Sequence, residues 1–385
     1  MKIIVVGLGE TGRALVRVLD ETDHDIIVVD ENAEVVDAVT DKYRVNGVVG
    51  SGASVQTLKK AGADTADFLI ALTHTDEINL LCCMQAKATG TKLCAARILQ
   101  PDLVSEEETL KQKYSIDFFV KPRLDLAEEV YRNIGLPGYV KLESYMDEKI
   151  YVLDLNVVGA SPLIGKTIGA IRTEFEGGMQ IGLLIRGNKS QAPKDDLIVK
   201  DGDTLYIVVR KEGLDQAFRA LGIKRDKIRD VVIVGGRMSC GYLTQKLLAS
   251  GKKVTMIDDD NARARSKMDR FPEANVIYAE SDITEVLEEE RVEKADAIVS
   301  LTDNDETNLV VSMFAWSKKI PSVITRVDKQ VHVQLLHKVN IDITVSPTEI
   351  SVFRIIRFIS EASNTNPDEQ TMVAEFLKIV RMMRN

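Results

Sequence analysis

The sequence has few of the residues that build disulfide frameworks or metal centres. Its 385 residues include four cysteines, four histidines and one tryptophan. The cysteines are Cys82, Cys83, Cys94 and Cys240. They form no C-x-x-C pair, which argues against a disulfide framework. His332 and His337 stand five residues apart, but no acidic or cysteine partner completes a zinc set, so we predict no metal site.

Long apolar runs and an excess of positive charge are also missing. The apolar stretch near the N-terminus, residues 3–9, is far shorter than the ~20 residues that cross a bilayer, and no signal-peptide pattern follows it. The 59 acidic and 50 basic side chains give a net charge of −9. This charge argues against a nucleic-acid partner, because binding to a phosphate backbone needs a basic surface. We therefore expect a cytoplasmic protein with no nucleic-acid partner and no direct membrane insertion.

The most informative feature that the sequence does contain is a repeat. Residues 2–12 read KIIVVGLGETG, and residues 230–241 read DVVIVGGRMSCG. Later landmarks recur in the same order, at offsets of 228, 228, 229 and 229 residues: Gly7, Asp30, Thr73 and Arg97 have counterparts in Gly235, Asp258, Thr302 and Arg326. A repeat that keeps its register over about ninety residues predicts two tandem copies of one fold.

Each copy has the pattern of a doubly wound α/β unit. The apolar run at residues 2–6 is typical of a parallel strand that is buried on both faces, and residues 13–21 have helical spacing. Strand-like and helix-like segments alternate as far as residue 121, which predicts a parallel sheet with right-handed crossovers. Residues 139–222 instead contain short strands separated by turns, followed by a helix, which predicts a small α+β module.

We therefore predict an α/β fold with two tandem Rossmann-like units, each a doubly wound parallel sheet, and a small α+β module between them. The expected boundaries are 1–138 for the first unit, 139–225 for the module, 226–360 for the second unit and 361–385 for a C-terminal tail.

The turn after the first strand has the spacing of a dinucleotide-binding loop. Gly7 permits the tight turn, Gly9 lets the backbone approach a diphosphate, and Gly12 lets the helix pack on the strand. Amides at the helix N-terminus supply hydrogen-bond donors to phosphate. Asp30 ends the second strand, where a carboxylate can bind both ribose hydroxyls. Glu31 follows, and two negative charges would repel a 2′-phosphate, which favours NAD(H) over NADP(H). ADP or ATP presents the same ribose and remains an alternative.

The second copy keeps this frame but alters the turn. Arg237 stands where the first copy has Gly9, and Cys240 stands where it has Gly12. Arg237 adds a Cβ where the backbone should touch phosphate, although its guanidinium can itself pair with one. Asp258 keeps the ribose position. Two interpretations stay open: a nucleotide site with altered geometry, or a structural copy.

The chain resembles the TrkA proteins, the regulatory subunits of Trk-type potassium uptake systems, which are built from RCK domains. The resemblance covers residues 1 to about 360. It rests on Asp30 and on six segments: GLGETG at 7–12, VVGSGAS at 48–54, ALTHTDEIN at 71–79, AARI at 95–98, SPLIGKTI at 161–168 and SLTDNDETN at 300–308.

The resemblance implies nucleotide-binding positions in both copies. In the first copy they are Gly7, Leu8, Gly9, Glu10, Thr11, Asp30, Thr73, His74 and Arg97. The matching positions in the second copy are Gly235, Gly236, Arg237, Met238, Ser239, Asp258, Thr302, Asp303 and Arg326. Family members with two repeats usually carry a second small module at the C-terminus, and the residues after 360 are too few for one.

The resemblance further implies a regulatory subunit without enzyme activity. Such a subunit forms a homo-oligomer, a ring, beneath a membrane potassium transporter of the Trk type, and it lies at the inner face of the membrane through that partner. Two alternatives remain, namely an NAD-dependent dehydrogenase and a stand-alone nucleotide sensor. Hydride transfer needs a proton donor or base beside the nicotinamide. Tyr145 and Lys149 form a Y-x-x-x-K pair, but they span a turn expected between two strands, where helical spacing cannot bring both side chains to one face.

Overall fold

The structure, a computed structural model, falls into two compact units. One holds Met1–Asp125 together with the helix that begins at Pro347, and the other holds Leu126–Ser346. The described residues are 1–145, 148–159, 161–174, 179–187, 189–279, 283–329, 332, 336 and 343–363.

The first unit contains a six-stranded parallel sheet in the order β3-β2-β1-β4-β5-β6. The order reverses between β1 and β4, and such a switch point is where doubly wound sheets bind ligands. The strands are β1 (Lys2–Val6), β2 (Asp25–Asp30), β3 (Asn46–Val49), β4 (Phe68–Ala71), β5 (Leu93–Arg97) and β6 (Phe118–Val120). The helices between and after them are α1 (Glu10–Leu19), α2 (Ala33–Thr40), α3 (Val55–Lys60), α4 (Asp76–Thr89), α5 (Pro101–Ser105), α6 (Glu107–Tyr114) and α7 (Pro122–Asn133).

Strand β1 is buried on both faces, as its apolar run predicts. Successive side chains of a strand alternate between the faces of the sheet. Ile3 and Val5 accordingly lie in one apolar cluster, while Ile4 and Val6 lie in a second one. The carboxyl end of β1 is therefore held rigidly between two layers of core.

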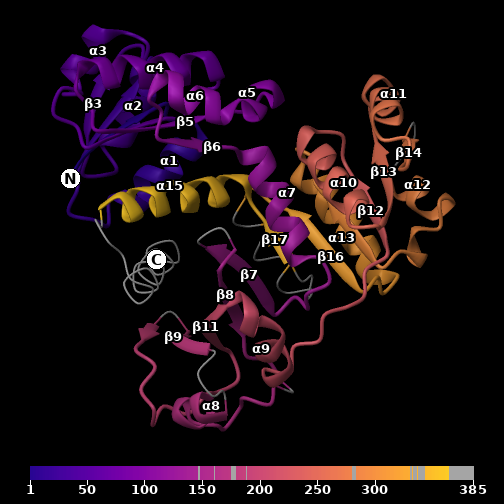
Figure 1. The fold of residues 1–385 in the computed structure, drawn as a ribbon. Helices are drawn as coiled ribbons and strands as arrows, with labels where there is room; N and C mark the ends of the chain where they lie inside the picture. Colours follow the sequence, from indigo (N-terminus) through magenta and orange to yellow (C-terminus); the bar gives the residue numbers. More distant parts are fainter. Residues whose placement is uncertain are drawn as a thin grey trace. The chain divides into compact units, whose positions relative to one another are not determined.

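The last described helix, α15 (Pro347–Ser363), packs on the first sheet although it follows the second repeat in sequence. Its apolar face lies in the same cluster as Ile3 and Val5. The ring of Phe358 stacks on Phe118 with ring centroids 4.9 Å apart, and it meets Phe68 edge-on at 5.8 Å. Figure 1 shows α15 running beside α1. Helix α15 thus completes the core of the first unit.

The second unit contains the small module, whose five-stranded antiparallel sheet has the order β10-β9-β11-β8-β7. The strands are β7 (Val140–Tyr145), β8 (Ile150–Asn156), β9 (Met179–Arg186), β10 (Lys189–Gln191) and β11 (Asp203–Arg210). Helix α8 (Ile168–Glu174) lies within it and helix α9 (Leu214–Ala220) follows it. The predicted α+β character is confirmed. Lys149 lies in the turn before β8, so the Y-x-x-x-K pair has no helical setting.

The second unit also holds a parallel sheet that repeats the first one strand for strand, in the order β14-β13-β12-β15-β16-β17. The strands are β12 (Asp230–Val234), β13 (Lys253–Asp258), β14 (Asn275–Tyr278), β15 (Ala297–Ser300), β16 (Ser322–Arg326) and β17 (Ile343–Val345). The helices are α10 (Met238–Ala249), α11 (Asn261–Arg270), α12 (Ile283–Glu289) and α13 (Asp305–Ser317). The tandem Rossmann-like architecture is confirmed.

Helix α7, which follows the first sheet, packs mainly within the second unit. The ammonium of Lys246 on α10 lies 3.6 Å from Glu128 and 5.6 Å from the ring centre of Tyr131. The last helix of each repeat therefore packs mainly in the unit that contains the other repeat. The exact domain boundaries stay a prediction, and most of the expected C-terminal tail lies outside the described residues. Among the described helices, none is both long and apolar enough to cross a bilayer.

Candidate functional site

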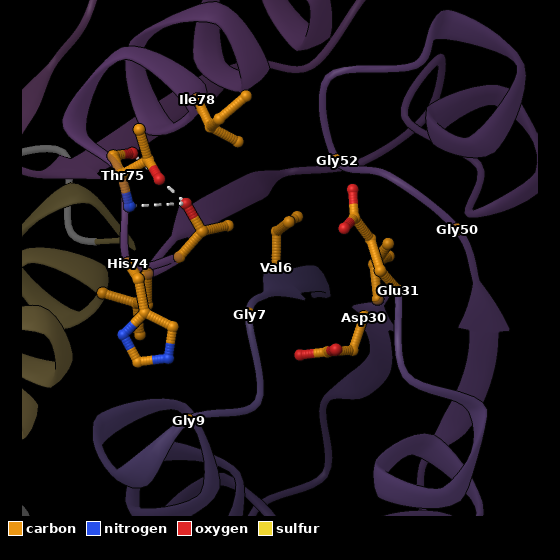
Figure 2. Close-up of a pocket in the computed structure, with 13 residues that line it drawn as sticks. Val6, Gly7, Gly9, Asp30, Glu31, Gly50, Gly52, His74, Thr75 and Ile78 are labelled. Atoms are coloured by element: carbon orange, nitrogen blue, oxygen red, sulfur yellow. Dashed lines mark hydrogen bonds between the residues drawn. The ribbon is translucent and has the colours of Figure 1, made fainter.

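A cleft opens at the carboxyl ends of β1, β2 and β4 in the first unit. These ends meet at one edge because Val6 pairs in register with Val29 and with Ala71. The cavity has a volume of about 230 Å³. Its lining residues are Val6, Gly7, Gly9, Val29, Asp30, Glu31, Gly50, Gly52, Leu72, Thr73, His74, Thr75 and Ile78 (Figure 2).

The glycine turn forms one wall of the cleft, and its geometry requires glycine. Gly7 has φ = 91°, and a Cβ there would lie 2.8 Å from the backbone of Leu72 and Thr73. A Cβ on Gly12 would lie 2.0 Å from the carbonyl oxygen of Gly7, so helix and strand pack as closely as the spacing predicts. A Cβ on Gly9 would meet only the His74 ring, at 3.7 Å. The surface over Gly9 is therefore open to a ligand.

The carboxylate of Asp30 lies beside this turn and is held by backbone amides. Leu8 donates its amide to Oδ2 at 2.7 Å, and Asn32 donates its amide to Oδ1 at 3.0 Å. Within the described part of the chain, no cation pairs with Asp30. Figure 2 shows the carboxylates of Asp30 and Glu31 on one side of the turn and the His74 ring on the other. The charge of Asp30 remains available to a ligand.

The opposite wall is fixed by Asn79, whose side chain is fully buried. The amide and the hydroxyl of Thr73 both donate to Asn79 Oδ1, at 2.8 and 2.7 Å. Asn79 Nδ2 in turn donates to the carbonyl oxygens of Thr73 and Arg97, at 3.1 and 2.9 Å. One side chain thus ties the ends of β4 and β5 together and sets where Thr73 lies.

The predicted positions of the first copy divide into two groups. Five of them line the cleft, namely Gly7, Gly9, Asp30, Thr73 and His74. The others do not: Leu8 is buried and contributes its amide, Glu10 and Thr11 begin α1, and Arg97 donates to the carbonyl oxygen of Thr73. Burial lowers the pKa of the Arg97 guanidinium, although the Asp76 carboxylate nearby opposes this shift. Whether any of these residues binds a nucleotide stays a prediction.

Some residues of the cleft were not predicted to be site residues. Gly50 and Gly52 follow β3 and form the wall beside Glu31, and Ile78 adds an apolar side chain from α4. Asn79 was missed as well, yet a signal for it exists. It recurs as Asn308 at the same offset of 229 as Thr73 and Thr302, and a buried amide that appears in both copies indicates a shared role.

The second copy surrounds its acidic residue with cations. Asp258 is fully buried, and Lys267 Nζ lies 2.7 Å from its Oδ2 while Arg263 lies 2.8 Å from its Oδ1. Burial opposes the charge on Asp258, but hydrogen bonds from Arg263 and Lys267 outweigh burial and hold the pKa of this carboxyl below its usual range. Both cations come from α11, the helix that follows Asp258.

Four more predicted positions of the second copy are paired internally, namely Arg237, Thr302, Asp303 and Arg326. The Asp303 carboxylate forms one ion pair with Arg237 and another with Arg326. In each pair the nitrogen and the oxygen are 2.5 Å apart. Thr302 is fixed by Asn308 as Thr73 is by Asn79, since its amide and hydroxyl donate to Asn308 Oδ1 at 3.0 and 2.7 Å. The turn consists of Gly235 with φ = 128°, Gly236, Arg237, Met238 and Ser239, the last two beginning α10.

Metal ligation finds no support in the described parts of the chain, where no cluster of three or more histidine, cysteine or acidic side chains could hold an ion. His332 has an acidic neighbour that its sequence spacing does not reveal, because its Nδ1 lies 2.9 Å from Asp305. His337 lies outside the described residues. A pair of this kind is a single hydrogen-bond contact rather than a ligand set.

Comparisons with known families cover most of the chain. The TrkA-N domain matches residues 3–122 and again residues 231–347, and the TrkA-C domain matches residues 154–222. The Trk system potassium uptake protein TrkA homolog of Archaeoglobus fulgidus is 27% identical over 352 residues, which cover 91% of this chain and 79% of that protein. The TrkA protein of Vibrio alginolyticus is 26% identical over 370 residues, covering 95% and 81%.

Solved structures share the fold. The GsuK channel bound to NAD superposes with a TM-score of 0.69 at 19% identity, over 97% of this chain and 65% of that one. This chain thus spans less than two thirds of the channel. GsuK bound to ADP gives a TM-score of 0.58 at 15% identity, over 94% of this chain and 69% of that one. At such identities the likeness concerns the fold alone.

Proposed function

Since the chain belongs to the TrkA family, we propose that it is a cytoplasmic regulatory subunit that binds NAD(H) and controls a membrane potassium transporter of the Trk type. The observation that carries the proposal is the open cleft of the first unit. A turn of bare backbone lies there beside a carboxylate that no described cation neutralises. Backbone amides suit a diphosphate and a free carboxylate suits ribose hydroxyls.

The residues of this cleft fit a dinucleotide. Gly7 and Gly9 would hold the diphosphate. The space that a Cβ at Gly9 would occupy is open, so a ligand can approach the backbone there. Asp30 would bind the ribose of the adenosine half, and Glu31 beside it would repel a 2′-phosphate. NAD(H) is therefore favoured over NADP(H), while ATP or ADP offers the same ribose and diphosphate. The nicotinamide supplies redox chemistry only when a substrate and a proton donor are present.

Among the described residues that line the cleft, none is placed as the proton donor that the competing function, a dehydrogenase, needs. His74 is a titratable side chain in the cleft, but it lies over Gly9, at the turn that suits the diphosphate. A general acid or base must reach the substrate at the other end of the cofactor. We propose that the protein is not an enzyme. A change in nicotinamide absorbance during incubation with candidate hydroxy- and keto-substrates would contradict this proposal.

Assembly into a homo-oligomer, a ring in the proposed arrangement, is supported by one helix of the second unit. Val310, Met313 and Trp316 of α13 are 46%, 55% and 54% exposed. A spacing of three residues puts them on one side of the helix, and exposed large apolar side chains in a row indicate a protein–protein contact. We expect Met313→Lys to lower the mass measured by analytical ultracentrifugation.

Regulation follows if the nucleotide binds two forms of the ring with different affinity. A ligand shifts such an equilibrium only by its differential affinity, typically about 1–3 kcal/mol. The transporter partner would hold the protein at the inner face of the membrane. Co-purification of the tagged chain with a Trk-type pore subunit from the native membrane would favour this role over that of a stand-alone sensor.

Calorimetric titration tests the nucleotide assignment. NADH, NAD, ATP and ADP are titrated separately into the full chain and into Asp30→Ala. We expect NADH or NAD to bind the unaltered chain and to bind Asp30→Ala about 100-fold more weakly, since hydrogen bonds to a charged group are lost. Binding of all four nucleotides to Asp30→Ala as to the unaltered chain would show that the assignment of this site is wrong.

A further inference from the structure

We propose that the second cleft is closed to dinucleotides by three residues of its own, Gly236, Arg263 and Lys267, so that each chain takes up one dinucleotide although it carries two copies of the fold. Asp258 stands where Asp30 stands in the first copy. In the second copy the two cations occupy the carboxylate oxygens that a ribose would need. The inference rests on the proposed function in one respect, namely that the first cleft is the site that binds the dinucleotide.

The cations replace apolar residues of the first copy. With the offset of 228, Arg263 corresponds to Val35 and Lys267 to Val39. Val39 is buried in the core of the first unit. Lys267 holds the same buried side of its helix, with its side chain only 10% exposed, and its ammonium reaches Asp258 at 2.7 Å. A lysine at a core position is expensive to bury unless it is paired, and Asp258 is its partner.

A third exchange makes room for this cluster. Gly236 corresponds to Leu8. A Cβ at Gly236 would lie 2.3 Å from both carboxylate oxygens of Asp258 and 2.5 Å from Arg263 Nε. A leucine at this position is therefore incompatible with the cluster. The three exchanges are sterically and electrostatically consistent with one another, and together they draw the carboxylate against the turn.

Opening this cluster is unfavourable for two reasons. A ribose hydroxyl is neutral and offers a weaker partner to a carboxylate than an ammonium and a guanidinium do. Displacing the cations would also leave Lys267, which is buried, without its counter-ion. The turn beyond is occupied in a similar way, because Arg237, where the first copy has Gly9, pairs with Asp303. The second copy thus carries its own partners at the ribose position and at the turn.

The test counts binding sites on the full chain with NADH as the probe. We expect calorimetry to give one NADH per chain, and we expect Asp30→Ala to lose about 100-fold in affinity. If the unaltered chain takes up two NADH per chain, the second cleft binds and the inference is overturned, whereas unchanged binding to Asp30→Ala contradicts the assignment of the first cleft. If the unaltered chain takes up no nucleotide at all, the proposed function fails, whereas the closure of the second cleft is supported.

A second experiment tests whether Gly236, Arg263 and Lys267 are what closes the second cleft. Gly236→Leu, Arg263→Val and Lys267→Val restore the residues of the first copy and are combined with Asp30→Ala. We expect this chain to bind NADH at least about tenfold more tightly than Asp30→Ala alone. An unchanged affinity in a folded chain contradicts the role of these residues. Should the variant not fold, hydrogen exchange on the unaltered chain decides, since NADH should protect amides at residues 7–12 and leave those at 235–241 unchanged.

Discussion

The two parallel sheets share strand order and a buried asparagine, yet the acidic residue that ends their second strand has opposite surroundings. Asp30 accepts two backbone amides and faces an open cleft. Asp258 is buried between Lys267 and Arg263. The same carboxylate is therefore open to a ligand in one copy and paired with cations of its own chain in the other. A duplicated fold can keep its framework while side chains on one helix decide whether the site remains accessible.

The largest difference between the copies is expected from removing each carboxylate. Asp258→Ala leaves the buried ammonium of Lys267 without its counter-ion, which typically costs about 3–5 kcal/mol. Asp30→Ala breaks no described ion pair but leaves the amides of Leu8 and Asn32 without their acceptor, so it should cost about 1–2 kcal/mol. Urea unfolding followed by fluorescence of Trp316, the only tryptophan, reports on the second unit, and hydrogen exchange reports on the first. Equal losses from the two variants would contradict the contrast.

The position after the glycine turn should also respond unequally. Gly12→Ala places a Cβ against the Gly7 carbonyl at 2.0 Å, so we expect a loss of about 3 kcal/mol in the first unit from overpacking. The corresponding Cys240 already has a side chain, which is fully buried. Cys240→Ala removes one sulfur atom and should cost about 1 kcal/mol. Thermal melting of both variants provides the measurement.

Replacing the asparagine that both copies share should distinguish a role in positioning the cleft from a role in stability. Asn79→Ala and Asn308→Ala each leave buried backbone and hydroxyl groups without partners, and each should cost about 2 kcal/mol. Only Asn79→Ala should also weaken NADH binding, because it frees Thr73 in the open cleft. Calorimetry on both variants, at a temperature where both are folded, measures this. Equal NADH affinities in the two variants would contradict the proposal that Asn79 positions the cleft.

Acid should affect the second cleft through Asp258. The folded-state pKa of this carboxyl is lowered by Arg263 and Lys267 against the opposing effect of burial. Its stabilising contribution is therefore present above the unfolded pKa of about 3.9 and is lost as pH falls through the lower, folded value. In acid titrations followed by Trp316 fluorescence, Asp258→Asn should flatten the pH dependence below about pH 4. An unchanged slope would show that other carboxylates dominate.

Most of the architecture was accessible from the sequence because both copies repeat the same strand pattern and glycine turn. The altered turn at Arg237 and Cys240 was visible too. The closing cluster was not, since Arg263 and Lys267 belong to a polar helix whose pattern does not reveal that Lys267 faces the core. The partner of α15 was also hidden, because an apolar helical face indicates burial but not which sheet covers it.

The placement of α15 has a consequence for anyone who divides this chain. A fragment that stops before Pro347 would lack α15. The surface of the first sheet that Val352 and Phe358 cover would then be exposed to water. Bare aliphatic surface of this kind drives aggregation. The last helix of each repeat belongs mainly to the unit that contains the other repeat, so neither repeat can be excised cleanly at its sequence border. Soluble pieces would have to be made by grafting α15 onto the amino-terminal sheet.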